Sequence, residues 1–292
     1  MISYPKISLI TPNFNGIKYL EQTILSIVSQ GYPNLEYIVM DGGSTDGSVE
    51  VIEKYEKHIT FWESKPDQGL YHAVQNGFNR STGEIMGWIN SDDLHMTNSL
   101  FTLADFFSSN QDINWIQGYP VVIDDDNRIV FHRLGVNSKL AFYLRDFMNG
   151  SFIQQESTFW TRKLWEKAGG YVSTEYKFAG DFELWIRFFN HDVLYLTDAI
   201  IGGFRMRQGG QLSTANYDVY LSECNQIIDS CYPSLSGKEK SLLKKAILSR
   251  KFNAALPDFL GFMRVNCLER KITPSFPVLK FNFDQYAFKL KS

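Results

Sequence analysis

One stretch of the chain decides how the rest is interpreted: Gly83-Glu84-Ile85-Met86-Gly87-Trp88-Ile89-Asn90-Ser91-Asp92-Asp93. Its apolar residues 85–89 predict a short buried strand that runs directly into two adjacent carboxylates. Adjacent carboxylates repel each other, and a hard divalent cation between them and a ligand relieves that repulsion. A solvated turn that caps the next helix would explain the same pair. Polar residues also end the other predicted strands, and this favours a binding site over a helix cap.

The chain before this stretch alternates predicted strands with predicted helices. Apolar runs predict strands at 7–11, 35–40 and 59–62, and residues such as Leu20, Ile24 and Ile27 have the spacing of a helix between two of them. Repeated strand–helix units indicate an α/β fold with a mostly parallel, Rossmann-like central sheet and helices on both faces.

Ligands of such sheets bind beyond the carboxyl ends of the strands, and here those ends are polar. Each polar residue taken alone is explained equally well by a turn or a helix cap. Their common position at one edge of the sheet predicts a shared binding site. The residues concerned are Thr11, Asn13, Asp41, Lys65, Asp67, Asp92 and Asp93.

Two later segments carry further polar residues. Asp181 precedes an apolar helical stripe, so it lies at the mouth of a helix, either as a cap or as a functional group. Arg205 and Arg207 precede a Gly-rich turn at 208–213, a combination that suits a phosphate, although paired surface arginines are often merely solvated. The acidic run at 124–127 lacks the ligand pattern of a calcium loop and predicts a hairpin tip.

Composition and charge limit the possible classes of protein. The chain has 292 residues with 44% hydrophobic residues, enough for a sizeable core. Its three Cys have no metal-ligand spacing, and a low odd number argues against a disulfide scaffold. We find no signal region at the N-terminus and no apolar run near the ~20 residues that span a bilayer. We therefore expect a cytoplasmic protein.

The C-terminal part differs from the rest in pattern and charge. From Tyr217 onward the spacing is helical, so we divide the chain into an α/β domain at 1–215 and a helical C-terminal extension at 216–292. Residues 232–292 contain twelve Lys and Arg against four Asp and Glu. A basic, Phe-rich tail suits peripheral contact with an anionic membrane at its inner face. A basic helical cap or a homodimer contact would explain the same composition.

Taken together, five motifs resemble those of family 2 glycosyltransferases, which have the GT-A fold. The resemblance covers about 5–215 and is specific because of the order and spacing of the motifs. The type it suggests is an inverting enzyme of bacterial cell-surface polysaccharide synthesis. The motifs are Ile-Thr-Pro-Asn-Phe-Asn (10–15), Tyr-Ile-Val-Met-Asp-Gly-Gly-Ser-Thr-Asp-Gly (37–47), Ser-Lys-Pro-Asp-Gln-Gly-Leu-Tyr-His-Ala-Val-Gln-Asn-Gly (64–77), Asn-Ser-Asp-Asp (90–93) and Gly-Asp-Phe-Glu-Leu-Trp-Ile-Arg (180–187).

The resemblance implies a nucleotide-diphospho-sugar donor, a UDP-sugar foremost. Asp93 would bind Mn²⁺ or Mg²⁺ at the diphosphate, Asp92 would contact ribose or sugar, and Asp181 would take the proton from the acceptor hydroxyl. One base without an enzyme nucleophile implies a single displacement with inversion. The nucleotide would contact Thr11, Pro12, Asn15, Asp41, Lys65 and Asp67, and the loop with Arg205, Arg207 and Gln208 would close over the diphosphate.

The sequence departs from the family pattern at two positions. Gly180 precedes Asp181 where the family often has Glu, and Gln208 lies about where a His often contacts the metal or phosphate. The Gln-x-x-Arg-Trp motif of processive polymer synthases is absent, which favours transfer of a single sugar to a glycan or a lipid-linked acceptor.

Two other classes remain open. A nucleotidyltransferase can share the sheet, but it usually needs a Gly-rich loop with Arg after the first strand, and residues 11–16 contain no such run. The departures at Gly180 and Gln208 also allow a non-catalytic sugar-nucleotide-binding protein. Nucleic-acid binding has no support outside the basic tail.

Overall fold

A nine-stranded sheet forms the centre of the part of the chain that the computed structural model describes, residues 4–132, 138–149, 152–207, 216–255, 275–282, 284–285 and 287–290. The strand order is β13-β12-β10-β6-β9-β4-β1-β2-β3. In chain order these strands are β1 (Ile7–Asn13), β2 (Leu35–Asp41), β3 (Phe61–Ser64), β4 (Ile85–Trp88), β6 (Trp115–Gln117), β9 (Thr158–Thr161), β10 (Tyr195–Thr197), β12 (Val278–Asn282) and β13 (Ala287–Leu290).

A smaller sheet adjoins it and has the order β5-β11-β7-β8. Its strands are β5 (Leu94–His95), β7 (Val121–Ile123), β8 (Ile129–His132) and β11 (Gly202–Arg205). The predicted acidic hairpin tip at 124–127 is the connection between the antiparallel strands β7 and β8. The small sheet matters for function because β5 directly follows the paired aspartates.

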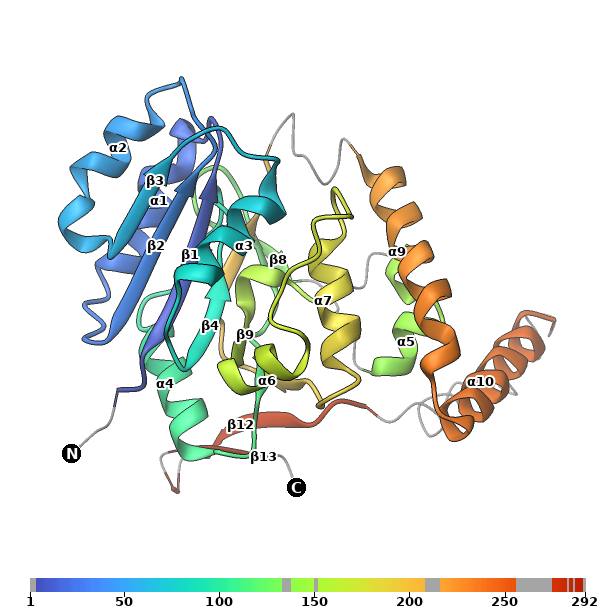
Figure 1. Cartoon of the computed structure of the whole chain (residues 1–292). Coiled ribbons are helices and arrows are strands. Elements are labelled where there is room, and N and C mark those ends of the chain that lie inside the picture. The colour runs from blue at the N-terminus through green and yellow to red at the C-terminus, as the bar shows by residue number, and fades with distance from the viewer. Residues whose placement is uncertain are drawn as a thin grey trace.

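Helices cover both faces of the main sheet, as the alternation of strands and helices predicts (Figure 1). Side chains alternate along β2, so Ile38 and Met40 join one core while Tyr37 and Val39 join the other. The first core includes residues of α3 and α7, and the second includes residues of α1 and α4. The helices are α1 (Ile17–Val28), α2 (Ser48–Lys54), α3 (Leu70–Arg80), α4 (Ser99–Ser109), α5 (Lys139–Tyr143), α6 (Arg162–Lys167), α7 (Gly180–Phe188), α9 (Tyr217–Cys231) and α10 (Gly237–Ala255).

A cluster of tryptophans joins α7 to the sheet. Trp88 at the end of β4 stacks on Trp185 of α7, with ring centroids 5.9 Å apart and planes only 9° apart. Trp115 stacks on the same Trp185 ring at 5.8 Å. The stack packs α7 against the carboxyl end of β4, where Trp88 is the last residue.

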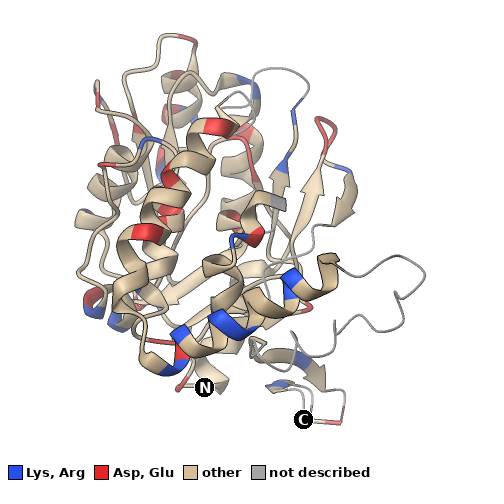
Figure 2. Cartoon of the chain, turned by 90° about the vertical axis from the view of Figure 1, so that its right-hand side faces the viewer, with Lys and Arg blue, Asp and Glu red and all other residues tan. Residues whose placement is uncertain are grey.

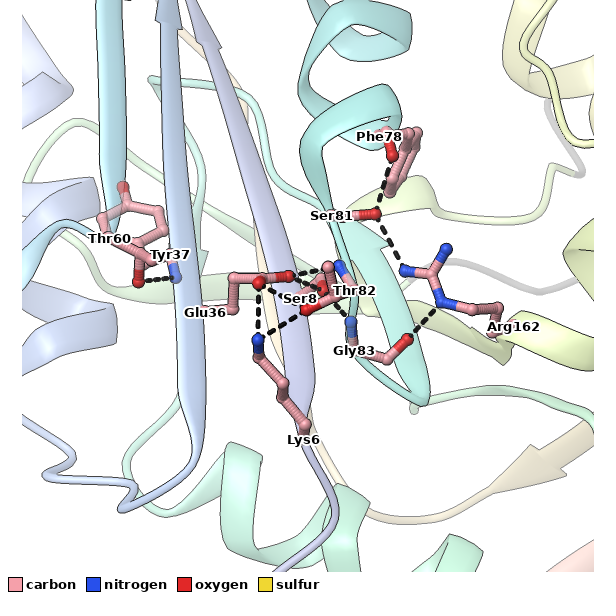
Figure 3. A network of polar contacts seen from close by, with 10 residues as sticks. All are labelled: Lys6, Ser8, Glu36, Tyr37, Thr60, Phe78, Ser81, Thr82, Gly83 and Arg162. Carbon is pink, nitrogen blue, oxygen red and sulfur yellow. Dashed lines mark hydrogen bonds and ion pairs between the residues drawn. The ribbon is translucent and has the colours of Figure 1, made fainter.

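A buried polar network closes the amino end of the sheet (Figure 3). Glu36 of β2 accepts hydrogen bonds from Lys6 Nζ at 2.6 Å, from Ser8 Oγ at 2.5 Å and from the N–H and hydroxyl of Thr82 at 2.6 and 2.7 Å. Burial by itself would raise the pKa of Glu36, but these donors lower it to about 2. The network ties the segments that lead into β1, β2 and β4 to one carboxylate.

The predicted fold class is confirmed, with a mostly parallel sheet and a helical C-terminal part, but three details differ. Strand β9 runs antiparallel between β4 and β6. Strand β1 continues through Pro12 to Asn13, which is possible because its pairing with β4 ends at Ile10 and leaves Pro12 paired on one side only. The sequence at 152–161 predicts one strand, but the structure has a short 3₁₀ turn, Gln155–Ser157, before β9.

The C-terminal segment contains strands as well as helices. After α9 and α10, β12 pairs in parallel with β10, and β13 pairs antiparallel with β12, so these residues extend the main sheet. The division at residue 215 stays a prediction, and the two late strands lie beyond it in sequence. Within the described residues, no helix combines the length and apolar character that crossing a membrane requires.

Candidate active site

The polar residues that end the parallel strands meet at one edge of the sheet. The register pairs Asn13 of β1 with Asp41 of β2, and Asp41 with Ser64 of β3. Strand β4 ends at Trp88, level with Ile10 of β1, so the following residues 90–93 emerge at the same edge. The structure therefore brings the four predicted strand ends together.

Asp41 organises the loops at this edge. Its carboxylate accepts hydrogen bonds from Asn13 Nδ2 at 2.7 Å, from Ser64 Oγ at 2.6 Å, and from the hydroxyl and N–H of Ser44 at 2.5 and 2.9 Å. Burial would raise the pKa of Asp41, but the hydrogen bonds lower it, so the group is ionised at neutral pH. Donors from three successive strand ends thus converge on one charge.

The first predicted nucleotide-binding residues occupy different environments. Thr11 is fully buried and its hydroxyl receives a hydrogen bond from Tyr37 at 3.0 Å, so its side chain lies inside the sheet. Pro12 is buried within β1. Asn15 lies on the exposed loop with φ of 50°, where its side chain accepts the Thr45 N–H at 3.0 Å. Only Asn15 of these three is placed where it can face a ligand.

An aromatic ring that the sequence reasoning missed lies beside these residues. Phe14 is 67% exposed, which is unusual for a large apolar side chain at the end of a core strand. A Cβ at Gly42 would lie 3.2 Å from the Phe14 ring and 3.3 Å from Asp67 Oδ2, so Gly42 forms a floor between them. The signal available in the sequence was the aromatic residue between two asparagines. Lys65, by contrast, pairs at the surface with Glu63 at 2.8 Å.

The paired aspartates and the arginine segment are brought into contact by β5 and β11, which pair antiparallel. Asp92 forms an ion pair with Arg207 at 2.8 Å, and Asp93 Oδ1 accepts the backbone N–H of Arg205 at 2.8 Å. Gln208, which the sequence adds to this loop, lies outside the described residues.

The two arginines have different surroundings. The Arg205 side chain is fully buried, and its guanidinium donates to the backbone carbonyls of Asp92 and Asp124 and to Asn127 Oδ1. Arg207 is partly exposed and contacts the Asp92 carboxylate. Arg205 therefore holds the loops together, while Arg207 is the guanidinium that can reach a bound anion.

Asp93 is a buried carboxylate with few donors. It is only 1% exposed, and burial, followed by repulsion from Asp92 and Glu156, raises its pKa well above the ordinary value. Burial also raises the pKa of Asp92, although Arg207 opposes this. Excess negative charge that is removed from water attracts a cation.

These oxygen donors fit Mn²⁺ or Mg²⁺. Within the described ranges, no group of three or more His, Cys, Asp and Glu side chains could hold a metal ion by itself. Metal ions that act with nucleotides usually take one or two carboxylates and complete their shell with water and phosphate oxygens. Asn90 adds a buried Oδ1 that has no hydrogen-bond partner among the described residues.

Asp181 lies in the first turn of α7, and its contact with Tyr71, in the first turn of α3 after the end of β3, places it at the same edge. Its Oδ1 accepts hydrogen bonds from the Tyr71 hydroxyl at 3.0 Å and from the N–H of Phe182 at 2.8 Å. Burial raises the pKa of Asp181 to about 6, although both hydrogen bonds act in the opposite direction. A carboxylate that titrates near 6 is suited to accept a proton at neutral pH.

The fold and this site define an α/β enzyme that acts on a ligand at the carboxyl edge of its sheet. The model of the Glycosyl transferase family 2 matches residues 8–164, more than half of the chain. The chain belongs to this family and is a glycosyltransferase.

Similar proteins agree with this assignment. An uncharacterized glycosyltransferase of Mycobacterium tuberculosis, Rv1514c, is 29% identical over 190 residues, which is 64% of this chain and 70% of the relative. The putative teichuronic acid biosynthesis glycosyltransferase TuaG of Bacillus subtilis is 29% identical over 126 residues, or 41% of this chain and 49% of TuaG.

Solved structures of S. aureus TarS share the fold. The TarS fragment 1–349 in complex with UDP-GlcNAc superposes with a TM-score of 0.64 at 20% identity, covering 91% of this chain and 77% of that chain. This chain spans about half, 47%, of a longer TarS chain.

Proposed function

We propose that this glycosyltransferase moves one sugar from a nucleotide-diphospho-sugar to a hydroxyl group of a glycan or lipid-linked acceptor, with inversion at the sugar carbon. The observation that carries the proposal is the meeting of Asp92, Asp93 and Arg207 at the sheet edge that also presents Asp181. A UDP-sugar and a role in surface polysaccharide synthesis are supported by the TarS complex with UDP-GlcNAc and by the name of TuaG.

The nucleotide would bind at the ends of β1 and β2. The exposed Phe14 ring offers a face on which the base stacks, and Gly42 lets Phe14 and Asp67 lie close to the turn after β2 at the edge of that face. Asp41 keeps the surrounding loops in place through its hydrogen bonds, and Asn15 lies at the rim.

The diphosphate would lie against the paired aspartates. Asp93, with Asp92 beside it, would hold Mn²⁺ or Mg²⁺, which when bound stabilises negative charge on the departing diphosphate. Arg207 would exchange part of its pairing with Asp92 for the phosphate oxygens and add a second positive charge there. Asp92 would then be available to the ribose or the sugar.

Asp181 would act as the general base. As the acceptor oxygen bonds to the anomeric carbon, its proton passes to Asp181 Oδ, and the bond from that carbon to the diphosphate oxygen breaks. Tyr71 and the Phe182 N–H hold the carboxylate for this step. A single displacement of this kind inverts the configuration at the sugar carbon.

A panel of UDP-, GDP- and dTDP-sugars, each with and without Mn²⁺, tests the donor by thermal shift. We expect one nucleotide to stabilise the protein in a Mn²⁺-dependent way, and Asp93→Ala to abolish that shift. Absence of any shift would contradict the proposal. Binding without turnover of any donor would instead favour a non-catalytic sugar-nucleotide-binding protein.

Exposed residues of the C-terminal extension support the proposal that it contacts an anionic membrane peripherally. In α10, Lys244, Lys245 and Lys251 are exposed together with Leu248 and Phe252, which are 65% and 52% exposed, and Figure 2 shows the basic positions along this side of the molecule. Each Lys near an anionic bilayer contributes ~1 kcal/mol, and the apolar pair adds insertion into the interface.

Co-sedimentation with vesicles that contain phosphatidylserine tests this contact. We expect the triple substitution of Lys244, Lys245 and Lys251 by Glu to abolish pelleting, while Lys57→Glu on the exposed η1 turn (Glu56–His58) leaves it unchanged. Substitution is preferable to truncation because removal of residues 232–292 would also remove β12 from the sheet. Equal pelleting of all variants would refute membrane contact.

A further inference from the structure

A carboxylate from the C-terminal extension fixes the backbone just before Asp181. Glu223 of α9 accepts the backbone N–H of Lys177 on one oxygen and those of Phe178 and Ala179 on the other, each at 2.9 Å. These residues immediately precede α7, which begins at Gly180. Figure 1 shows α9 beside α7.

Glu223 supplies the hydrogen-bond acceptor that the sequence next to α7 lacks. The three successive backbone N–H groups of residues 177–179, just before the helix, need acceptors, and Ala179 at the cap position has no polar side chain to offer. A negative charge near the start of a helix is also favourable for the helix dipole. The acceptor therefore comes from a segment 44 to 46 positions later in the chain.

A second contact reaches Asp181 from α3. The Tyr71 hydroxyl lies 2.8 Å from the carbonyl oxygen of Phe178 and 3.0 Å from Asp181 Oδ1, so it joins the segment before α7 to the carboxylate. A Cβ at Gly180 would lie 2.8 Å from the Tyr71 ring and 2.9 Å from the carbonyl oxygen of Ser173. Gly180, which replaces the Glu common in the family, is the residue that permits this approach.

We infer that Glu223 and Tyr71 are positioning residues for Asp181, and that helix α9 of the C-terminal extension thereby completes the base site. The inference rests on the proposed role of Asp181 as the base. It assigns to the extension a part in the reaction that is separate from membrane contact.

The two residues act on the protonation of Asp181 in opposite directions. Burial is the largest cause of the raised pKa of Asp181, the Tyr71 hydrogen bond lowers it, and the charge of Glu223 raises it. Tyr220 and Cys224 of α9 also face Asp181, but burial raises the pKa of both groups, so they remain neutral at pH 7. Glu223 is therefore the charged neighbour whose removal moves the titration.

Carboxyl ¹³C NMR of aspartate-labelled protein tests the inference directly, with the Asp181 signal assigned by its loss in Asp181→Asn. We expect Glu223→Gln to lower the pKa of Asp181 by about half a unit and Tyr71→Phe to raise it by a similar amount. Asp218→Asn, which removes an exposed carboxylate from the same helix, should leave the value unchanged. Unshifted values, or shifts of the same sign in both variants, would overturn the inference.

Hydrogen exchange and kinetics test the positioning. We expect the amides of Lys177, Phe178 and Ala179 to exchange at least ~10-fold faster in Glu223→Ala, and kcat for UDP release from UDP-GlcNAc to fall by about tenfold with the donor KM within twofold. Unchanged exchange or unchanged kcat would overturn the inference. Undiminished transfer by Asp181→Asn would refute the base role itself, and the NMR and exchange results would still report on Glu223.

Discussion

Glu36 at the amino edge of the main sheet and Asp93 and Asp181 at the carboxyl edge are buried carboxylates in opposite states, whereas Asp41 at the carboxyl edge resembles Glu36. At the amino edge, Glu36 is surrounded by donors from Lys6, Ser8 and Thr82, and its pKa is lowered to about 2 (Figure 3). At the carboxyl edge, burial raises the pKa of Asp93 well above the ordinary value and that of Asp181 to about 6.

The difference lies in which groups stabilise each carboxylate. Glu36 receives its donors from the protein, so it stabilises the fold in every state of the molecule. Asp93 and Asp181 have fewer protein donors than their burial requires, and a cation or a substrate proton can supply the remainder. Burial alone thus does not separate Glu36 from Asp93 and Asp181, whereas the number of protein donors does.

The largest expected effect is on the carboxyl edge, in Asp181→Asn. Loss of a general base should lower the rate of sugar transfer by about a thousandfold while donor binding stays within a fewfold. In the wild type, the rate should fall as pH drops below about 6, because the folded-state pKa of Asp181 is raised and the protonated form cannot accept a proton. A rate that is independent of pH between 5 and 7 would contradict this assignment.

The next largest effect is expected at the amino edge, in Glu36→Gln. The free energy of unfolding at neutral pH should fall by roughly 3 kcal/mol, because the lowered folded-state pKa of Glu36 is a stabilisation that is present above pH ~4.5. In the wild type this stabilisation should be lost as pH falls towards 2. In the variant, the free energy of unfolding should fall less over the same pH range. Urea unfolding measures both, with Glu50→Gln at an exposed site of α2 as the control.

Asp93→Asn should have the reverse stability effect. Without nucleotide, the free energy of unfolding should rise rather than fall, because the amide oxygen can still accept the Arg205 N–H without a buried charge. Mn²⁺-dependent donor binding should weaken by about 2 kcal/mol, a factor near 30. If unfolding experiments showed destabilisation comparable to Glu36→Gln, the contrast between the two edges would be refuted.

The smallest expected effect concerns the exposed Phe14 ring at the rim of the site. Phe14→Ala should weaken nucleotide binding by about 1 kcal/mol through loss of stacking, with little change in stability because the ring is already exposed. Leu25→Ala, at an exposed apolar position of α1, serves as the matched control. Calorimetric titration with the nucleotide measures the difference, and equal affinities would remove Phe14 from the site.

The sequence predicts well what depends on local pattern. Alternating strands and helices predicted the order of the first elements, and strand ends predicted that Asp41 and the pair Asp92–Asp93 share an edge. It could not predict contacts between distant segments. Thr11 faces inward, where its hydroxyl accepts a hydrogen bond from Tyr37. Arg205 is buried because its guanidinium donates hydrogen bonds to the carbonyl groups of Asp92 and Asp124.

The C-terminal segment shows the same limit at a larger scale. Strands β12 and β13 are short and have no strong alternation, so they become strands because the edge of β10 is available to pair with. Glu223 likewise has no distinctive sequence context, and its partners at 177–179 are known only from the packing of α9 on α7.

The stack of Trp185 on Trp88 allows the packing of α7 on the sheet to be followed by spectroscopy. Trp88, Trp115, Trp160 and Trp185 form contacts with ring centroids 5.6 to 5.9 Å apart, close enough for their transitions to couple, which gives a circular dichroism band that belongs to this cluster. The band reports on the helix that carries Asp181 and on the strand that leads to Asp92 and Asp93. Donor binding, membrane attachment and the Glu223 variants can therefore be compared by one spectroscopic signal that needs no label.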